Sequence, residues 1–271
     1  MHFYTEESEM ANDYTDRFSG VGRLLGKEAF ERLGNARVCV IGIGGVGSWT
    51  VEALARSGVG EITMIDLDDI CVTNVNRQLH AIDGQIGRSK AGAMAERVSA
   101  INPGCDVVVQ EKFFTAETAE QLLAPNYDLV VDAIDTLDQK ALLIAEVRKR
   151  ELPLVVCGGA GGKRDATAIR VADLARASHD PLLRQVRKTL RREFGFPRND
   201  IVDFGVRAVF SVENPVYPWS DGTVRDFTEP GSELRLNCDS GFGTAAFVTG
   251  GFGFAAAGEA VRILSGLAVA R

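Results

Sequence analysis

A glycine-rich turn follows an apolar run early in the chain, and together they could hold a phosphate group. Val38–Ile41 is typical of a buried strand, and the turn after it leads into a helix. Backbone N–H groups that glycine leaves uncovered at a helix N-terminus attract anions, because the helix dipole is positive there. Asp66 ends the next apolar run, where folds that bind nucleotides this way place an acid for the ribose hydroxyls. The glycines predicted to line the nucleotide are Gly42, Gly44, Gly45 and Gly47.

Polar side chains follow Asp66 closely in the sequence and indicate which kind of reaction the nucleotide takes part in. An NAD-dependent oxidoreductase would share the glycine turn and the acid, so those two features alone leave the ligand open. Asp68 and the segment Asn74–Gln78 fall at the carboxyl edge of the predicted sheet, where ligands of such folds bind. A nicotinamide enzyme does not need these groups. They favour chemistry on a phosphate, and the oxidoreductase stays as an alternative.

Helical and strand periods alternate from about residue 28 onward. The alternation predicts strands at 36–41, 61–66, 105–110, 128–132 and 153–157, with helices at 46–57, 88–101, 115–124 and 137–150 between them. Right-handed crossovers through such helices give a mostly parallel sheet with helices on both faces. The second half adds strands at 167–172 and 204–212, a basic helix at 178–194, a loop at 215–233 and an apolar segment at 241–264. The predicted fold class is α/β, with a doubly wound, Rossmann-like sheet.

The two halves of this pattern show no clear linker between them. We therefore predict a single domain over residues 17–271, with a nucleotide-binding half at 17–160 and a substrate-binding elaboration with a C-terminal helix at 161–271. Residues 1–16, which are polar and acidic at their start, are expected to form a flexible N-terminal arm.

Composition places the chain among soluble globular proteins of the cytoplasm. It has 271 residues, 45% of them hydrophobic, and a net charge of −7, so any contact with nucleic acid must come from a local basic patch. The five cysteines are odd in number, widely spaced and without a Cys-x-x-Cys pair, which predicts a reducing compartment and no zinc. The uncharged stretch 241–258 is at the lower length limit for a membrane span, but glycine and threonine dilute it and Glu259 follows at once. We expect a buried core helix there, and membrane contact is not expected.

Several ordered motifs together resemble the adenylation domain of ubiquitin-activating-type enzymes, the ThiF/MoeB/HesA superfamily. They are the glycine turn, Asp66-Leu-Asp68, Asn74-Val-Asn-Arg-Gln78, Lys90 and Asp132-Ala-Ile-Asp135, and the match covers about residues 17–160. The resemblance implies that ATP binds with Asp66 on its ribose. It further implies a set of residues around the triphosphate, with Asp68 nearby and Asp135 as the magnesium ligand: Asn74, Arg77, Gln78 and Lys90.

Charge development explains why such residues suit the reaction that the resemblance implies. Attack by a carboxylate on the α-phosphate builds negative charge, which arginine, lysine and a metal ion stabilise in a site that excludes water. Arg77, Lys90 and Asp135 are therefore the candidate catalytic residues. Simpler interpretations stay open for two of them, because Lys90 could be a solvated helix residue and Asp135 a helix N-cap.

Within that superfamily the whole chain resembles the family of bacterial tRNA threonylcarbamoyladenosine dehydratases. The segments that carry this closer match are Arg17–Gly20, Arg23–Gly26, Asp69–Asn74, Cys157–Lys163, Tyr217–Gly222 and Cys238–Gly243. The resemblance implies ATP-dependent cyclisation of threonylcarbamoyladenosine in tRNA. The substrate carboxylate is adenylated and the carbamoyl nitrogen then attacks it, which closes a hydantoin ring. Both reacting groups belong to one substrate, which favours intramolecular closure.

Two departures from superfamily patterns bear on partners. Relatives that activate sulfur carriers usually have paired Cys-x-x-Cys zinc ligands in the second half, and their absence here weighs against the alternative of a sulfur-carrier-protein adenylyltransferase. The family resemblance implies a homodimer, in which relatives often supply an arginine to the partner subunit's ATP. Gly20 stands at that position here, and Arg17 or Arg23 is left to compensate.

Cys238 and the basic helix are the remaining candidates. Cys238 lies in a loop rich in Gly, Asp and Ser before an apolar helix, whose N-terminus could raise thiol reactivity. Some relatives pass an acyl group through a cysteine, but ring closure needs no covalent step, so a structural thiol is the other interpretation. Four cations spaced three and four apart on the basic helix could follow an RNA backbone or form an ordinary solvated face: Arg184, Arg187, Lys188 and Arg191.

Four further possibilities concern ions, partners and a non-enzymatic role. The glycine cluster 158–162 could bind a monovalent cation, and Lys163 after it could face substrate or cap a loop. A sulfur-relay protein is a possible partner. The non-enzymatic alternative is a tRNA-binding or sulfur-relay protein that keeps the nucleotide fold.

Overall fold

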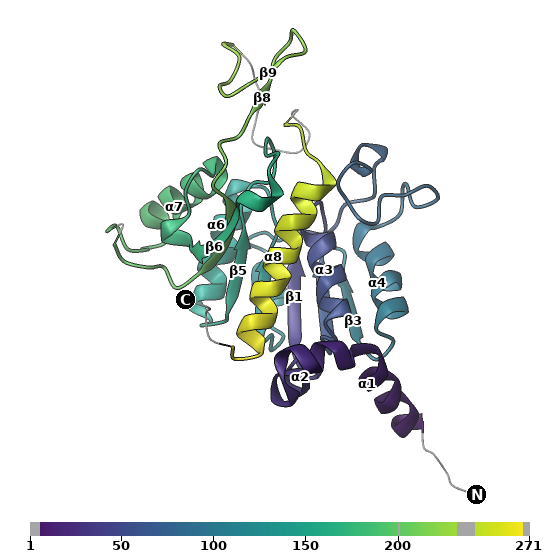
Figure 1. Cartoon of the computed structure of the whole chain (residues 1–271). Helices are drawn as coiled ribbons and strands as arrows, with labels where there is room; N and C mark the ends of the chain where they lie inside the picture. The colour runs from purple at the N-terminus through teal and green to yellow at the C-terminus, as the bar shows by residue number, and fades with distance from the viewer. Residues whose placement is uncertain (1–5, 200, 232–241, 268–271) are drawn as a thin grey trace, which may run out of the picture.

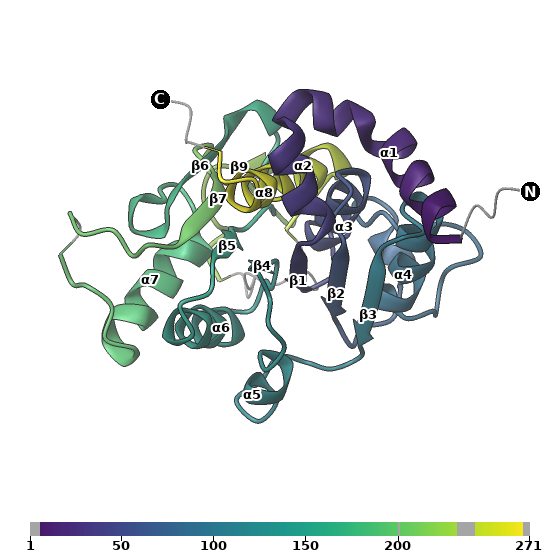
Figure 2. The same ribbon diagram turned by 90° about the horizontal axis from the view of Figure 1, so that it is seen from below.

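Seven strands form one sheet whose strand order reverses beside the glycine turn. The computed structural model describes residues 6–199, 201–231 and 242–267. The strands lie in the order β3–β2–β1–β4–β5–β7–β6, and all neighbours are parallel except β6 and β7 (Figure 2). Their bounds are β1 Arg37–Ile41, β2 Glu61–Ile65, β3 Asp106–Gln110, β4 Leu129–Asp132, β5 Leu154–Cys157, β6 Ile169–Asp173 and β7 Arg207–Ser211. The prediction of a doubly wound, mostly parallel sheet is confirmed.

Helices cover both faces of the sheet because side chains alternate along each strand. In β1, Val38 and Val40 pack into one core, whereas Cys39 and Ile41 pack into the other. The first core lies under α3 Gly47–Arg56, α4 Lys90–Ile101 and α8 Ala246–Leu264, with α1 Glu6–Leu25 and α2 Lys27–Gly34 at the end of that layer (Figure 2). The second lies under α5 Ala119–Leu122, α6 Leu137–Lys149 and α7 Pro181–Glu193.

Helix α8 crosses the middle of the sheet and packs directly on α3 (Figure 1). A Cβ at Gly253 would lie 2.6 Å from the Cβ of Trp49 and 2.7 Å from the Val46 carbonyl oxygen, so only glycine permits this close approach. Glu259 is buried in an ion pair with Arg207 (2.5 Å) and with Arg262. By length and composition α8 could cross a membrane, but half of it is buried in the protein. Its contacts are those of the core helix that the sequence predicted.

Most element boundaries fall within three residues of the prediction, and the differences have local causes. The helix expected at 115–124 is only the single turn α5, because Thr115 and Thr118 bond to each other and to the nearby backbone. A flexible arm was expected over residues 1–16, whereas α1 already begins at Glu6. Tyr14 anchors this helix through a stack on Phe30 and a 2.6 Å hydrogen bond to the Gly58 carbonyl.

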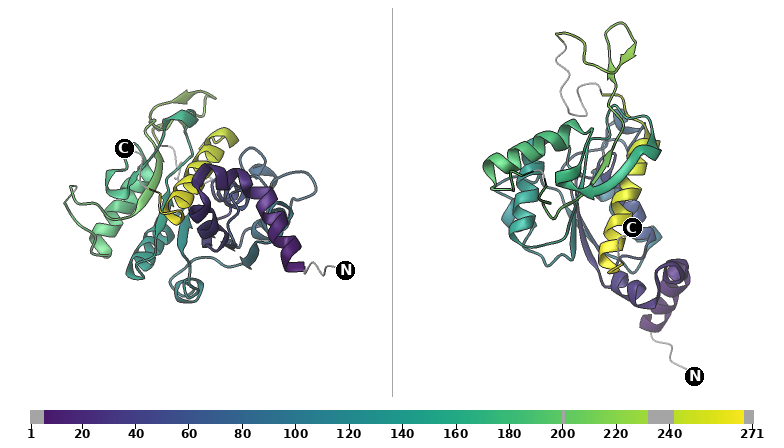
Figure 3. Two further views of the ribbon diagram at one scale, coloured as in Figure 1. Left: turned by 60° about the horizontal axis from the view of Figure 1, so that its bottom comes forward. Right: turned by 60° about the vertical axis from the view of Figure 1, so that its left-hand side comes forward.

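Short elements fill connections in both halves of the chain. The 3₁₀ turns are η1 Val72–Asn74, η2 Ala166–Ala168 and η3 Leu174–Arg176. A two-stranded hairpin, β8 Tyr217–Pro218 with β9 Val224–Arg225, stands beyond the body of the protein at the end opposite to α1 (Figures 1 and 3). It follows β7, so it rises from the carboxyl edge of the sheet, where the polar groups of the candidate site also lie.

Candidate active site

The turn after β1 has a shape that requires glycine. Gly42 has a φ of 88°, and a Cβ there would lie 2.9 Å from the backbone of Ala133 in the β4–α6 loop. A Cβ at Gly47 would lie 1.8 Å from the Gly42 carbonyl oxygen. Side chains at these positions would separate the turn from the neighbouring loop, so both glycines are needed to form it.

The same turn leaves several backbone donors open. The N–H of Ser48 bonds to the Gly44 carbonyl, which begins the hydrogen bonding of α3. No described residue accepts a hydrogen bond from the N–H groups of the four preceding residues, which are Gly44, Gly45, Val46 and Gly47. Unsatisfied donors at the positive end of a helix are suited to phosphate oxygens. This arrangement fits the triphosphate of ATP.

Asp66 follows β2 and bonds to the backbone of the glycine turn. One carboxylate oxygen accepts the N–H of Ile43 (2.6 Å), and the other accepts the N–H of Asp68 (2.8 Å). Burial raises the pKa of Asp66, and these two N–H groups together with Lys90 oppose that rise. The acid predicted to hold the ribose is thus already bonded to the turn that was predicted to hold the phosphates.

Lys90 begins α4 and is buried rather than solvated. Its Nζ lies 2.7 Å from a carboxylate oxygen of Asp68, whose side chain is about half exposed. Ser89 caps the helix by accepting the N–H of Gly92. A buried cation at the carboxyl edge, paired with one exposed acid, can meet an anionic ligand, and the solvated-helix interpretation of Lys90 is wrong.

The segment around η1 brings the remaining predicted polar groups to the turn. Asn74 is buried and its side-chain oxygen accepts the N–H of Cys71 (2.9 Å). Arg77 is 9% exposed, and its guanidinium donates to the Thr73 carbonyl (2.8 Å) and to the side-chain oxygen of Asn76 (3.0 Å). These contacts hold the cation in one orientation before any ligand arrives.

Gln78 carries a buried polar atom without a partner. Its Oε1 is shielded from solvent and has no hydrogen-bond partner among the described residues, and its Nε2 would be the nearest atom to a Cβ at Gly44 (3.8 Å). A buried polar group left open is costly unless a ligand or water satisfies it. Gln78 therefore fits a position beside a bound nucleotide.

Helices α3 and α8 bond to the backbone carbonyl of Arg77, which the sequence did not predict. Trp49 Nε1 (3.0 Å) and Thr249 Oγ1 (3.2 Å) both donate to the Arg77 carbonyl. The amide nitrogen of Asn76 donates to the Thr244 carbonyl (2.9 Å). Asn76 lay inside a recognised motif and could have been found, but no sequence signal joins Thr249 to a residue 172 positions away.

Asp135 occupies the exposed loop between β4 and α6, the loop that packs on Gly42. The loop is held by Asp132, whose Oδ1 accepts the N–H of Ile134 (3.0 Å) and lies 2.8 Å from Nζ of Lys140. Asp132 and Lys140 are fully buried. Burial raises the pKa of Asp132, against the pull of the Lys140 ammonium. The inward orientation of Lys140 on its helix was not predicted from the sequence.

No preformed metal cluster is present in the part of the chain that the structure describes. None of its His, Cys, Asp and Glu side chains form a group of three or more that could hold a metal ion. A magnesium ion at Asp135 would need further oxygen ligands from the nucleotide phosphates and water, which is the usual way that this ion binds beside ATP.

The glycine cluster 158–162 is closed by its own side chains. Asp180 caps α7 and accepts the N–H groups of Gly159 and Leu183 (both 2.9 Å). A Cβ at Gly158 would lie 2.1 Å from that carboxylate. Lys163 is buried and donates to the carbonyl groups of His179 (3.0 Å) and Glu213, so it closes a loop instead of facing the nucleotide turn.

The four cations of the basic helix differ in exposure. Arg184 and Lys188 are exposed, whereas Arg187 and Arg191 are half-buried. The guanidinium of Arg191 donates to the Pro197 carbonyl and lies 5.3 Å from the ring centre of Phe204. Helix α7 therefore presents a narrower cationic surface than its spacing suggested.

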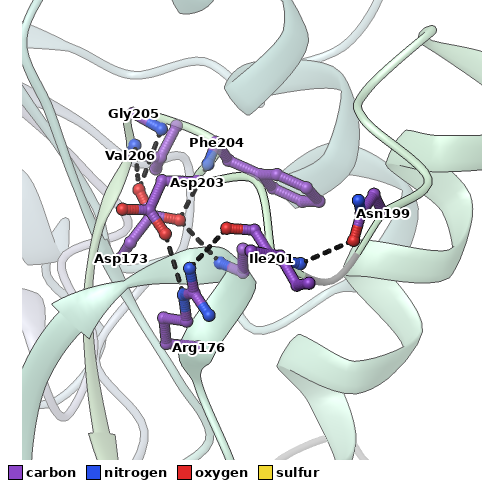
Figure 4. Close-up of polar contacts among 9 residues, drawn as sticks. Asp173, Arg176, Asn199, Ile201, Asp203, Phe204, Gly205 and Val206 are labelled. Atoms are coloured by element: carbon purple, nitrogen blue, oxygen red, sulfur yellow. Dashed lines mark hydrogen bonds and ion pairs between the residues drawn. The ribbon is translucent and has the colours of Figure 1, made fainter.

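The connection from α7 to β7 is fixed by one carboxylate (Figure 4). Asp173 accepts the N–H groups of Ala175, Phe204, Gly205 and Val206. Arg176 donates to Asp203 and to the Ile201 carbonyl on the same connection. The cluster sets the position of Phe204 and thereby of Arg191, which makes it part of the support for the basic helix.

The remaining predicted features are Cys238 and the two arginines of the N-terminal segment. Cys238 lies outside the described residues. Arg17 pairs with Asp13 (2.6 Å) and Arg23 donates to Ser19, both on α1 at the end of the molecule opposite to the hairpin (Figure 1). Neither arginine reaches the glycine turn of its own chain.

Similarity to known proteins extends over nearly the whole chain. The ThiF family model matches residues 19–270. The tRNA threonylcarbamoyladenosine dehydratase of Escherichia coli (strain K12) is 48% identical over 255 residues, which cover 93% of this chain and 95% of that protein. The protein of the same name from Haemophilus influenzae is 46% identical over 251 residues, with 92% and 94% covered. The crystal structure of the E. coli dehydratase in complex with ATP has a TM-score of 0.84 at 43% identity and covers 95% of this chain and 97% of that one.

Proposed function

The chain belongs to the ThiF family, and on that basis we propose that it is an ATP-dependent tRNA threonylcarbamoyladenosine dehydratase. The observation that carries the proposal is the meeting of open backbone donors on the turn Gly44–Gly47 with two buried cations, Arg77 and Lys90. The full-length similarity to dehydratases from two organisms gives the substrate class, threonylcarbamoyladenosine in tRNA.

ATP enters as a substrate, and the geometry suits transfer of its adenylyl group. The triphosphate would take the N–H groups of the turn, with its ribose toward Asp66. Lys90 would contact the phosphates, either in place of its ion pair with Asp68 or in addition to it. Arg77 would neutralise the charge that builds as the threonylcarbamoyl carboxylate attacks the α-phosphate. Magnesium, held by Asp135 and the phosphates, would neutralise charge on the departing pyrophosphate.

Ring closure needs little further chemistry from the protein. The O–P bond of the new acyl-adenylate activates the carboxyl carbon, the carbamoyl nitrogen attacks it, AMP leaves and a proton is lost from the nitrogen. Nucleophile and electrophile belong to the same side chain of the base, so orientation alone gives a large advantage over an intermolecular reaction. This reaction sequence does not require a thioester at Cys238.

RNA would approach over the carboxyl edge of the sheet. Arg184 and Lys188, the exposed cations of α7, would contact its phosphates, with Arg187 and Arg191 supporting the helix surface. The net charge of −7 makes such a local patch necessary for RNA binding.

The finer assignments are part of the same proposal. We place the enzyme in the cytoplasm, as a homodimer that covers exposed apolar side chains such as Leu24 and Phe254. A sulfur-relay protein stays a candidate partner. A monovalent cation near 158–162 would have to take carbonyl ligands that Asp180 and Lys163 do not already use.

The decisive experiment measures products on modified tRNA. Purified protein, Mg-ATP and tRNA carrying threonylcarbamoyladenosine should release pyrophosphate, and mass spectrometry of the digested nucleosides should show the loss of one water from the modified base. Unmodified tRNA is the control. Release of pyrophosphate that requires a small carrier ending in Gly-Gly, and not tRNA, would replace the proposal with a sulfur-carrier-protein adenylyltransferase.

A further inference from the structure

We propose that His80 is a positioning residue that aims the phosphate-binding turn, an inference that rests on the proposed use of this turn for ATP. His80 lies beyond the Arg77-Gln78 pair and is 4% exposed. Its Nε2 is 2.8 Å from the Ile43 carbonyl oxygen, inside the glycine turn. The ring thus contacts the backbone that binds the ligand, and it has no place of its own in the adenylation chemistry.

The peptide groups on both sides of Ile43 are fixed. Its N–H donates to Asp66 at 2.6 Å, and the Gly42 N–H before it donates to the Ile65 carbonyl at 2.9 Å. Its carbonyl is held by His80. Ile43 is therefore held from both ends, by a carboxylate at the end of β2 and by an imidazole from the η1–α4 connection.

The carbonyl of Ile43 and the N–H of Gly44 belong to one planar, trans peptide group, so they point in opposite directions. Holding the carbonyl toward His80 directs the Gly44 N–H away from it, as the first of the four open donors of the turn. Glycine tolerates both orientations of such a peptide group, because it has no Cβ to restrict φ and ψ. Without the imidazole, the group could rotate and present a carbonyl oxygen to the phosphates.

The ring can only act as the donor in this bond, because a carbonyl oxygen accepts. Nε2 therefore carries the hydrogen, and Nδ1 is buried with no partner among the described residues. Burial lowers the pKa of His80, as does the nearby Lys90 ammonium, while the bond to Ile43 opposes this. The neutral ring with its hydrogen on Nε2 is the form that holds the turn.

Two substitutions separate the hydrogen bond from the bulk of the ring. His80→Gln places an amide N–H near the position of Nε2, whereas His80→Leu fills similar volume without a donor. Calorimetry with a non-hydrolysable ATP analogue should show about tenfold weaker binding for His80→Leu and near wild-type binding for His80→Gln. Should His80→Leu not fold, His80→Asn gives the same test, because its amide nitrogen lies too close to the backbone to reach Ile43.

Asn102→Leu is a matched control. Asn102 is 1% exposed, and its side-chain N–H donates to the Val59 carbonyl at 3.1 Å, which is the same kind of buried bond away from the turn. It should lower the thermal midpoint as His80→Leu does, but leave affinity for the analogue unchanged. In steady state, His80→Leu should raise KM for ATP and leave KM for tRNA unchanged.

The outcomes distinguish this inference from the proposed function. Equal affinity of His80→Leu and wild type, or equal losses in His80→Gln and His80→Leu, would overturn the role of His80. If the variants follow the expected order for the analogue but wild type releases no pyrophosphate with modified tRNA, the role of His80 stands and the dehydratase proposal fails. Absence of analogue binding by wild type would overturn both.

Discussion

Two regions of the carboxyl edge of the sheet differ in how their polar groups are satisfied. Around β1 and β2, the donors of Gly44–Gly47 and the Oε1 of Gln78 are left open. Beyond β5, Asp180 and Lys163 use their polar atoms on the protein's own backbone. Open polar groups are costly unless a ligand satisfies them, whereas satisfied ones rigidify a scaffold. The first region is thus built for a ligand and the second for support.

Breaking the buried ion pair between Asp132 and Lys140, which lies between these regions, should give the largest effect, a loss of stability. Lys140→Met leaves Asp132 buried and without its cation, which should lower the free energy of unfolding by about 3–5 kcal/mol. Urea denaturation measures this. The double variant Asp132→Asn/Lys140→Met keeps an acceptor for the Ile134 N–H and should recover much of the loss. A loss below about 1 kcal/mol for Lys140→Met alone would show that this pair does not support the loop.

On the ligand side, Arg77→Ala should act on activity and little on stability. Loss of one preorganised charge-stabilising group should slow tRNA-dependent pyrophosphate release by about 10²–10³-fold. Arg77→Lys, which keeps the charge but cannot donate to both Thr73 and Asn76, is the matched control and should recover part of the rate. Wild-type turnover by the alanine variant would remove Arg77 from the reaction.

The turn itself can be tested by adding a single methyl group. Gly47→Ala would place its Cβ 1.8 Å from the Gly42 carbonyl, so the turn must move and affinity for the ATP analogue should fall about tenfold or more. At Gly44 the nearest atom to an added Cβ is 3.8 Å away, so Gly44→Ala is the space-tolerant control. Calorimetry on both variants measures the difference. Similar affinities would mean that the shape of the turn does not control nucleotide binding.

A smaller effect is expected on the support side, where α7 is proposed to meet RNA. Arg184→Gln/Lys188→Gln removes the two exposed cations and should weaken tRNA binding several-fold and flatten its dependence on salt. Lys27→Gln, which removes a highly exposed cation on α2, a helix that lies apart from α7, is the control (Figure 1). Titration at several salt concentrations measures both quantities. An unchanged salt slope would return α7 to an ordinary solvated helix face.

The smallest effect concerns pH. The pKa of His80 is lowered in the folded protein by burial and by Lys90, so the unfolded chain binds its proton more readily. Stability from His80 is therefore fully present above about pH 6.5, the value for an unfolded histidine, and is lost as pH falls through its folded pKa. The difference in thermal midpoint between wild type and His80→Gln should become smaller as the pH is lowered through this range. A difference that stays constant would contradict a neutral, buried ring.

The sequence predicted the ligand side better than the support side, for a physical reason. The turn, Asp66 and Asn74–Gln78 are local patterns, in which neighbouring residues perform one task, and the structure brings them together. The contacts of Asp132 with Lys140 and of Arg77 with Thr249 join residues from different elements. Only tertiary packing decides whether a lysine on a helix faces inward, so neither contact could be read from spacing. For the same reason, the partial burial of Arg187 and Arg191 was missed.

The hold of α8 on Arg77 limits how this protein can be dissected. Thr249 and Thr244 bond to the arginine and to its neighbour Asn76, although they belong to the last hundred residues of the chain. A recombinant fragment that stops after β5 would contain every nucleotide-binding motif and still lack the contacts that orient its key cation. The motif-bearing half therefore lacks contacts that orient Arg77, and affinity tags or truncations near the C-terminal helix should be chosen with the proposed ATP site in mind.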